Sequence, residues 1–314
     1  MHDLAMTRAV LAAVLLAPAP ALAARYDPDA DRAALRQAAT ASRAAIVAAT
    51  GLALEPEKAS AIAAGIDEGL RQARLAAAAA RSLDAAARQR EAAMAADVKD
   101  AALDSKVKEA AAPVAAERLR WERASAEGAD LRKKVEALPE DERKKLLPLV
   151  AKAERALDSA AGALRPLEEA LKAAGERGLE MKAVRAKAAA PLVEVSSGAA
   201  GAIFRAEQLG APAAEAKARL ASLGEEPRAV SRSRAWEKLE PLRDAARLLF
   251  EAADRACNRA DDFRRRSASF DAASEAFGKA LSSAKAGPGA AKAALDEAQQ
   301  ELAKVRERLG KTGR

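Results

Sequence analysis

Histidine and cysteine, the residues that most often carry nucleophilic and metal chemistry, occur once each in these 314 residues, as His2 and Cys257. His2 lies in an N-terminal segment that we expect to be removed, so the mature chain would contain no histidine. That composition excludes Ser-His-Asp and Cys-His catalysis, histidine general bases and the usual histidine-containing zinc sites. No glycine-rich phosphate loop or EF-hand calcium loop is present either. We therefore expect no enzyme activity, no catalytic residue, no cofactor and no metal site.

Carboxylates and arginines are the remaining candidates for chemistry. Carboxylates are abundant, but the sequence offers no apolar pocket that would shift the pKa of a pair. The arginines form two dense clusters, which are Arg228, Arg232 and Arg234 in EEPRAVSRSRAW, and the run Arg264, Arg265 and Arg266. They could contact phosphates of nucleic acid, lipid head groups or an anionic envelope polymer. Acidic residues flank both clusters, and the alternative that we favour is a solvated, salt-bridged helix face.

The net charge is consistent with either interpretation of the arginines. The chain carries 53 basic and 46 acidic residues, for a formal net charge of +7. This modest excess on a highly charged surface is compatible with anionic partners but does not require them.

Cys257 and three phenylalanines have both a structural and a functional interpretation. A chain with one cysteine cannot form an internal disulfide, so Cys257 is either a buried thiol, which we favour, or one half of an intermolecular bridge. Phe263, Phe270 and Phe277 lie one heptad apart. They could line a groove for an apolar ligand or an unfolded client. Their register with a seam of leucines favours core packing instead.

The segment from Met6 to Ala23 has the three-part layout of a secretory signal peptide. Arg8 gives a positive start, a short apolar run follows, and Pro18 and Pro20 precede Ala21-Leu22-Ala23. The apolar run is well short of the roughly 20 residues that span a bilayer. We expect cleavage between Ala23 and Ala24, with residues 1–23 as the signal, 24–314 as the mature region, and a periplasmic or secreted location. The alternatives are a buried helix of a cytoplasmic protein and an uncleaved anchor.

The mature region has the composition of long helices. It is rich in alanine and charged residues, and aromatic residues are only 3% of the chain. Alanine buries little area, so a thick globular core is not expected. The predicted fold class is all-α, an elongated helical bundle with long helices and antiparallel coiled-coil hairpins.

Turn signals divide this single elongated α-helical coiled-coil region. We expect a helix up to Gly51, and a long one from about residue 57 to 127 with a kink at Pro113. Possible sub-boundaries lie near residues 128–139, 191–212 and 287. Pro139 starts a new helix, Gly175 and Gly178 mark a break, and residues 191–204 read as a loop or extended turn. A short helix between two turns follows, in residues 209–227.

The strongest periodicity is near the C-terminus, where apolar and small residues recur in alternating steps of three and four. The positions are Leu239, Leu242, Ala246, Leu249, Ala253, Ala256, Ala260, Phe263, Ser267, Phe270, Ser274, Phe277 and Leu281. KAGPGAAK then interrupts the pattern, and a final heptad helix runs from Leu295 to Leu309. A short loop between two such helices predicts an antiparallel hairpin.

These observations favour an exported structural or interaction protein that acts as a spacer, scaffold or adaptor in the cell envelope. One alternative is a periplasmic holdase-type chaperone that cradles unfolded clients, and another is a binder of an anionic envelope polymer or lipid. The expected partners are proteins or further copies of the chain, held through the heptad seams. No nucleic acid partner and no transmembrane span in the mature chain are expected.

The signal-peptide interpretation predicts the mature N-terminus. N-terminal sequencing of the protein exported by a bacterial host should begin at Ala24. A chain that keeps the Met6 segment and stays in the soluble cytoplasmic fraction would contradict this interpretation.

Overall fold

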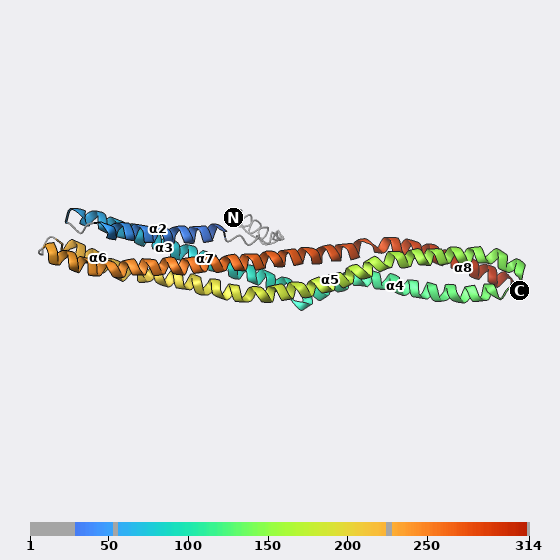
Figure 1. The fold of residues 1–314 in the computed structure, drawn as a ribbon. Helices are drawn as coiled ribbons and strands as arrows, with labels where there is room; N and C mark the ends of the chain where they lie inside the picture. Colours follow the sequence, from blue (N-terminus) through green and yellow to red (C-terminus); the bar gives the residue numbers. More distant parts are fainter. Residues whose placement is uncertain (1–28, 53–55, 224–227, 313–314) are drawn as a thin grey trace, which may run out of the picture. The chain divides into compact units, whose positions relative to one another are not determined.

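The computed structural model describes residues 29–52, 56–223 and 228–312. Within these ranges the elements are the helices α2 (Asp29–Gly51), α3 (Ala59–Asp97), α4 (Asp100–Glu136), α5 (Glu140–Gln208), α6 (Gly210–Ala221), α7 (Arg228–Ala286) and α8 (Pro288–Thr312), and the short 3-10 helix η1 (Pro56–Lys58), with no strand among them. The prediction of an all-α bundle of long helices is confirmed (Figure 1). The predicted signal segment, including the bond between Ala23 and Ala24, lies outside the described residues.

The chain divides into two compact units. The first unit comprises residues 1–93 and 191–264, and the second comprises residues 94–190 and 265–314. Helices α2 and α6 belong to the first unit, and α4 and α8 belong to the second. Helices α3, α5 and α7 contribute residues to both.

In the first unit, α2 and α3 form an antiparallel hairpin held by small residues. A Cβ placed on Gly65 would lie 2.7 Å from the Cβ of Ala49, and one on Gly69 would lie 2.5 Å from Cγ1 of Ile46. The hydroxyl of Ser42 donates a hydrogen bond of 2.8 Å to the Gly69 carbonyl. These contacts pair increasing numbers on α2 with decreasing numbers on α3, which defines the antiparallel direction.

In the second unit, α4 and α5 form another antiparallel hairpin, and α8 packs against it. The shared core includes Leu131, Val135, Val150, Leu157, Leu295, Leu302 and Val305. The indole nitrogen of Trp121 donates to the Leu157 carbonyl at 3.0 Å, which joins α4 to α5. The turn between these two helices is short, from residue 137 to 139. The acidic residues that follow Pro139 lie at the positive end of the α5 dipole, which stabilises the start of that helix.

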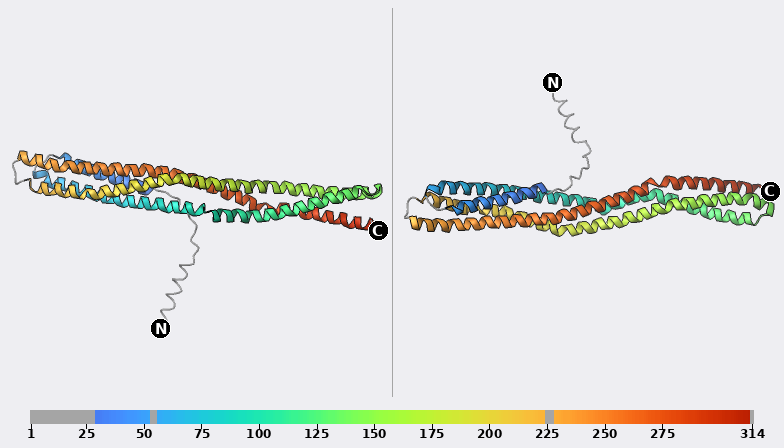
Figure 2. Two further views of the ribbon diagram at one scale, coloured as in Figure 1. Left: turned by 90° about the horizontal axis from the view of Figure 1, so that it is seen from below. Right: turned by 45° about the horizontal axis from the view of Figure 1, so that its top comes forward.

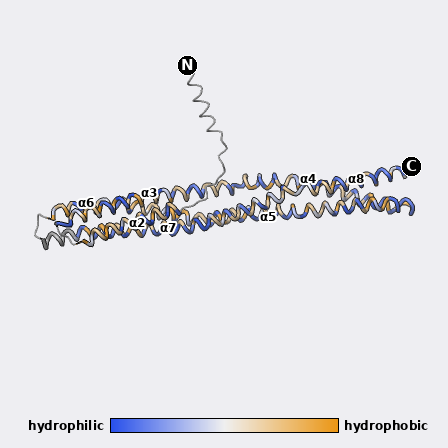
Figure 3. Tube along the Cα trace, turned by 90° about the horizontal axis from the view of Figure 1, so that it is seen from above, coloured by the Kyte–Doolittle hydropathy of each residue, from blue (hydrophilic) through white to orange (hydrophobic). Residues whose placement is uncertain are grey.

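The heptad seam of α7 is buried within a single chain. Every predicted position from Leu239 to Leu281 is buried except Ser274, which is half-buried. Figure 3 shows the resulting pattern, with hydrophobic and hydrophilic residues interspersed along each helix. Each helix therefore has an apolar stripe that is covered by the chain itself, and no second chain is needed to bury it.

The predicted hairpin between the last two helices is wrong. Only Gly287 separates α7 from α8, and α8 continues in the direction of α7 (Figures 1 and 2). Two ion pairs show the same direction of the chain. Lys285 of α7 contacts Glu109 of α4, and Asp296 of α8 contacts Arg120, which lies farther along α4. Pro288 disfavours helical geometry at the residue before it, yet its fixed φ suits the first turn of a helix. The sequence KAGPGAAK therefore interrupts the helix without reversing the chain.

The long N-terminal helix is divided at a different place from the one predicted. The interruption is at Val98 and Lys99, where Lys99 adopts a non-helical φ of −56° and ψ of 129°. Asp100 then lies in the first turn of α4, where the helix dipole favours an acidic residue. Helix α4 continues through Pro113 to Glu136, flanked there by the buried residues Ala110 and Val114.

Two further predicted breaks lie inside α5. The helix is continuous through Gly175 and Gly178 and through residues 191–204. A glycine costs only about 1 kcal/mol in a helix, and burial of neighbouring apolar side chains outweighs that cost. Gly178 itself packs near the ring of Phe277 and the side chain of Leu103, and Val195 and Ala199 are fully buried.

Replacement of Gly65 by alanine tests the α2–α3 contact. Alanine favours the helix by about 1 kcal/mol, but its methyl group would overlap that of Ala49, and overpacking costs about 1–3 kcal/mol. We expect a net destabilisation of up to about 2 kcal/mol in urea unfolding followed by circular dichroism. Gly175→Ala is the matched control, because nothing lies within 4 Å of its Cβ position. It should stabilise the protein, and equal effects at both sites would contradict the close contact.

Candidate functional site

The two predicted arginine clusters lie on the same helix but far apart. Arg228, Arg232 and Arg234 occupy the first two turns of α7, and their side chains are outside the described part of the structure. The second cluster begins 30 residues after Arg234, which is about 45 Å along a helix. The clusters therefore do not form a common site.

The second cluster is exposed and has acidic partners. The Arg264 guanidinium donates to Asp29 of α2 at 3.1 Å and lies 3.8 Å from Asp261. Arg265 and Arg266 are also exposed. Arg264 thus contributes to an ion-pair network between α2 and α7, with its positive charge balanced by two carboxylates.

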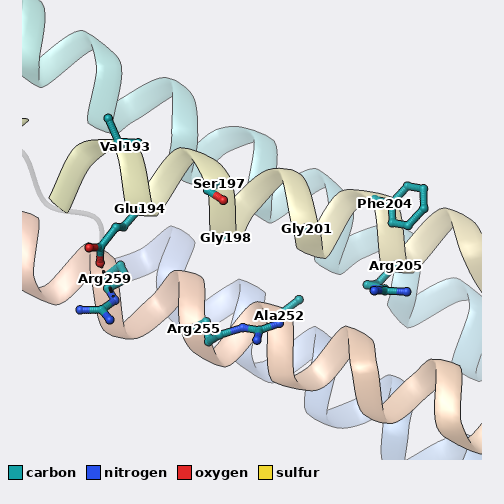
Figure 4. A pocket seen from close by; sticks show the side chains of 10 residues that line it. All are labelled: Val193, Glu194, Ser197, Gly198, Gly201, Phe204, Arg205, Ala252, Arg255 and Arg259. Atoms are coloured by element: carbon teal, nitrogen blue, oxygen red, sulfur yellow. Dashed lines mark ion pairs between the residues drawn. The ribbon is translucent and has the colours of Figure 1, made fainter. Parts of the chain in front are cut away.

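A groove that the sequence did not indicate lies between α5 and α7 in the first unit. It has a volume of about 590 Å³ and is lined by three arginines and two exposed apolar side chains. The lining residues on α5 are Val193, Glu194, Ser197, Gly198, Gly201, Phe204 and Arg205, and those on α7 are Ala252, Arg255 and Arg259 (Figure 4).

Small residues form the floor of this groove. A Cβ on Gly198 would lie 2.9 Å from the Cα of Ala256, and one on Gly201 would lie 3.9 Å from the Cβ of Ala252. The two helices therefore touch along their backbones at this level. Any larger side chain at Gly198 would force them apart, so this glycine sets the depth and the register of the groove.

Two large apolar side chains of the groove are exposed. Val193 is 66% exposed and Phe204 is 51% exposed. Figure 4 shows Phe204 directed away from the α5–α7 contact, with the Arg205 side chain beside it. The Arg205 guanidinium lies 5.4 Å from the centre of the Phe204 ring, within the range of a cation–π contact.

The arginines of the groove differ in their pairing. Arg259 forms an ion pair of 2.7 Å with Glu194 across the two helices (Figure 4). Arg255 is exposed and has no ion-pair partner among the described residues. We refer to this surface, from Val193 to Arg205 and from Ala252 to Arg259, as the basic groove.

A second groove adjoins the basic groove along the same pair of helices. It has a volume of about 520 Å³ and shares Arg205 with the first, but its acidic residues outnumber its basic ones. Glu237, Glu240 and Asp244 of α7 lie there, together with Leu248, Pro241 and Ala245, and with Gln208 and Pro212 from α5 and α6. We call it the acidic groove. The two grooves together offer charged and apolar contacts to another molecule.

The grooves do not follow from the sequence, because residues 191–204, predicted as a loop or extended turn, are helical. The buried positions Val195, Ala199, Ala202, Ala206 and Leu209 repeat in steps of three and four and would have indicated a helix. Phe204 lies off that seam. A large aromatic residue outside a regular seam, in a chain with few aromatics, was the available signal for an exposed apolar site.

The three phenylalanines and Cys257 belong to the core. Phe263, Phe270 and Phe277 are at most 4% exposed, which agrees with core packing and leaves no aromatic groove. The Cys257 thiol is buried and lies 3.4 Å from the Arg32 carbonyl, to which it donates a weak hydrogen bond. Burial raises the pKa of this thiol above its usual range. A buried, protonated thiol is poorly placed for an intermolecular disulfide.

Glu301 of α8 is a buried carboxylate held by two lysines. Its side chain is 4% exposed, and its carboxylate accepts hydrogen bonds from Lys152 at 2.8 Å and from Lys304 at 2.9 Å. The bond from Lys152, and then that from Lys304, lower the pKa of Glu301 below its usual range. This group joins α8 to α5 and has a structural role.

The described residues contain no group of three or more histidine, cysteine or acidic side chains that could hold a metal ion. No helix within the same ranges is both long and apolar enough to cross a membrane.

Comparison with known proteins identifies no relative. No protein-family model matches the chain, and neither a curated protein nor a solved structure is significantly similar to it.

Glu301 predicts a pH dependence of stability. Its folded-state pKa is lowered, so its contribution is complete above the unfolded-state pKa of about 4.3 and disappears as the pH falls through the folded-state value. Glu301→Gln should lower the thermal midpoint at pH 7, and the difference from wild type should shrink below about pH 4. Glu297→Gln, one turn away, is the control; its contact with the same Lys152, at 3.7 Å, is exposed and should contribute little. A constant difference for Glu301→Gln across this pH range would refute the assignment.

Proposed function

We propose that this chain is an exported structural or interaction protein, which acts as a spacer, scaffold or adaptor in the cell envelope. The observation that carries the proposal is the closure of the heptad seams within one chain. Because the helices bury their apolar stripes against one another, folding does not depend on a partner. The charged outer faces are then available to contact other molecules.

The length of individual helices supports a spacing role. Helix α5 has 69 residues without interruption, which corresponds to about 100 Å at 1.5 Å per residue. Ion pairs between neighbouring helices add to its lateral support, such as Arg132 with Glu154 and Arg259 with Glu194. Support of this kind along a long helix favours a spacer or scaffold role.

Export is the part of this proposal that depends on the sequence alone. The pattern of Arg8, the apolar run, the two prolines and Ala21-Leu22-Ala23 supports it. The scaffold role does not depend on compartment, since it follows from the closed seams and the charged faces.

A holdase-type chaperone is the competing function, but the three phenylalanines that favoured it have a different role. The phenylalanines that could have formed a client groove are in the core. A holdase also needs extensive accessible apolar surface, whereas the buried seams take up most of the apolar side chains here. The scaffold function is therefore the better supported of the two.

Small-angle scattering combined with a client assay tests the proposal. A compact protein of this length has a radius of gyration of about 20 Å, whereas a rod about 100 Å long, the length of α5 as one uninterrupted helix, has a radius of gyration of about 29 Å. We expect the larger value and no suppression of client aggregation at equimolar protein. A compact particle would contradict the spacer role, and suppression of aggregation would favour the holdase.

A further inference from the structure

A second stripe of residues runs along α7 in the first unit, on the side that lines the two grooves. It carries charged residues, whereas the buried seam is apolar. The stripe consists of residues that line the two grooves and recur in steps of three and four, namely Glu237, Pro241, Asp244, Leu248, Ala252, Arg255 and Arg259. Residues with this spacing lie on one side of a helix. Charge changes sign along the stripe, from acidic at Glu237 to basic at Arg259.

The two charged ends are placed almost symmetrically about Leu248. Glu237 and Arg259 each lie 11 residues from it, which is about 16 Å along the helix. Glu240 of the acidic groove and Arg255 lie eight and seven residues away, or about 12 and 10 Å. A surface with opposite charges at equal distances from its centre is complementary to itself after a half-turn.

From this symmetry we propose that the two grooves form a docking surface for a second copy of the same chain, in an antiparallel, two-fold arrangement centred near Leu248. In that arrangement Arg259 faces Glu237 of the second copy, and Arg255 faces its Glu240. Each of these contacts occurs twice, as an isologous interface requires. Arg255, Glu237 and Glu240 have no ion-pair partner among the described residues, so the interface would supply one.

The centre of the surface combines apolar side chains with the single charge of Arg205, and apolar contact is typical of the middle of an interface. Leu248 and Ala245 are half-buried, and the exposed ring of Phe204 lies on the adjacent turn of α5. The antiparallel register supports this placement, since Gly198 lies opposite Ala256 and Glu194 pairs with Arg259. The same register sets Arg205, the residue common to both grooves, opposite Leu248.

The size of the surface fits a modest dimer. From Glu237 to Arg259 the stripe is about 33 Å long, and two helices side by side are about 20 Å wide. The resulting footprint of about 650 Å² per copy is slightly below the 800 Å² of a standard interface. We therefore expect a concentration-dependent dimer that weakens with salt, because its charged contacts are screened.

Charge balance disfavours a polyanion as the occupant. The two grooves contain three arginines, at positions 205, 255 and 259, against four carboxylates, at positions 194, 237, 240 and 244. An anionic polymer laid along this face would meet repulsion over the acidic half. A second copy meets attraction over both halves, so it is the better match.

Light scattering coupled to size-exclusion chromatography tests the proposal on the full chain. In the Arg255→Glu variant, positions 255 and 240 are both acidic, and in the Glu240→Arg variant both are basic. These two positions face each other in the proposed dimer, so each variant alone should dimerise roughly tenfold or more weakly than wild type. An equimolar mixture of the two variants should recover the dimer, because every facing pair is again of opposite charge. Arg74→Glu, an exposed arginine of α3, is the matched control and should leave the mass unchanged.

The outcomes are distinguishable from loss of fold. Circular dichroism should show the same helix content in all variants. Recovery of the dimer in the mixture, and in neither variant alone, supports the interface. A monomeric wild type at high concentration and low salt overturns the proposal. So does a dimer that both variants keep, and so does retention of the wild type on an anionic polymer without any dimer.

A cysteine variant tests the two-fold centre. Leu248→Cys places two thiols near the proposed axis, and mild oxidation should link the dimer within the native protein. Glu237→Cys is the control, since two copies of that residue would be about 33 Å apart. Cross-linking of the Glu237→Cys variant, or none at Leu248→Cys in a protein that dimerises, would show that the arrangement is not the antiparallel one. The native Cys257 is buried and should remain unreacted.

Discussion

Close approach of helix backbones is the constraint on which this structure depends. Alanine and glycine bury little area each, so helices built from them gain stability only when they pack at short distance. Gly65 against Ala49 and Gly198 against Ala256 show this directly, because a single added carbon would collide at either place. Larger side chains such as Phe263 and Phe270 then fill the remaining space in the core.

Closure of the seams within one chain determines what is left on the surface. Most apolar side chains are buried in the core, and the outer faces carry acidic and basic residues. Single exposed ion pairs contribute little stability, at most about 1 kcal/mol each. Pairs between helices, such as Arg132 with Glu154, instead favour one register over others. Glu301 of α8 is the strongest case, because Lys152 of α5 binds its almost fully buried carboxylate, with Lys304 of α8 itself as a second partner.

The α5–α7 face departs from this pattern and is for that reason the best candidate for function. Phe204 and Val193 belong to the small set of large apolar side chains that are exposed among the described residues, and both line the same groove. Arg255 and Glu240 lack the ion-pair partners that most charged residues of the described helices have. The proposed scaffold role needs such a surface, and the change of charge sign along α7 would orient a partner bound there.

The sequence by itself determined the helical class, the buried seam of α7, the core position of the three phenylalanines and the buried thiol of Cys257. These follow from composition and from periodicity, which are local properties. The tertiary structure decided where helices stop and what they pack against. Residues 191–204 and the glycines at 175 and 178 remain helical because neighbouring helices bury the apolar residues around them. The chain does not reverse at Gly287, because the apolar side chains of α8 pack against α4 and α5. The charge-bearing grooves arise from residues on α5 and α7 that are about 50 positions apart along the chain. Only the register of two packed helices brings such residues together, and no local pattern specifies it.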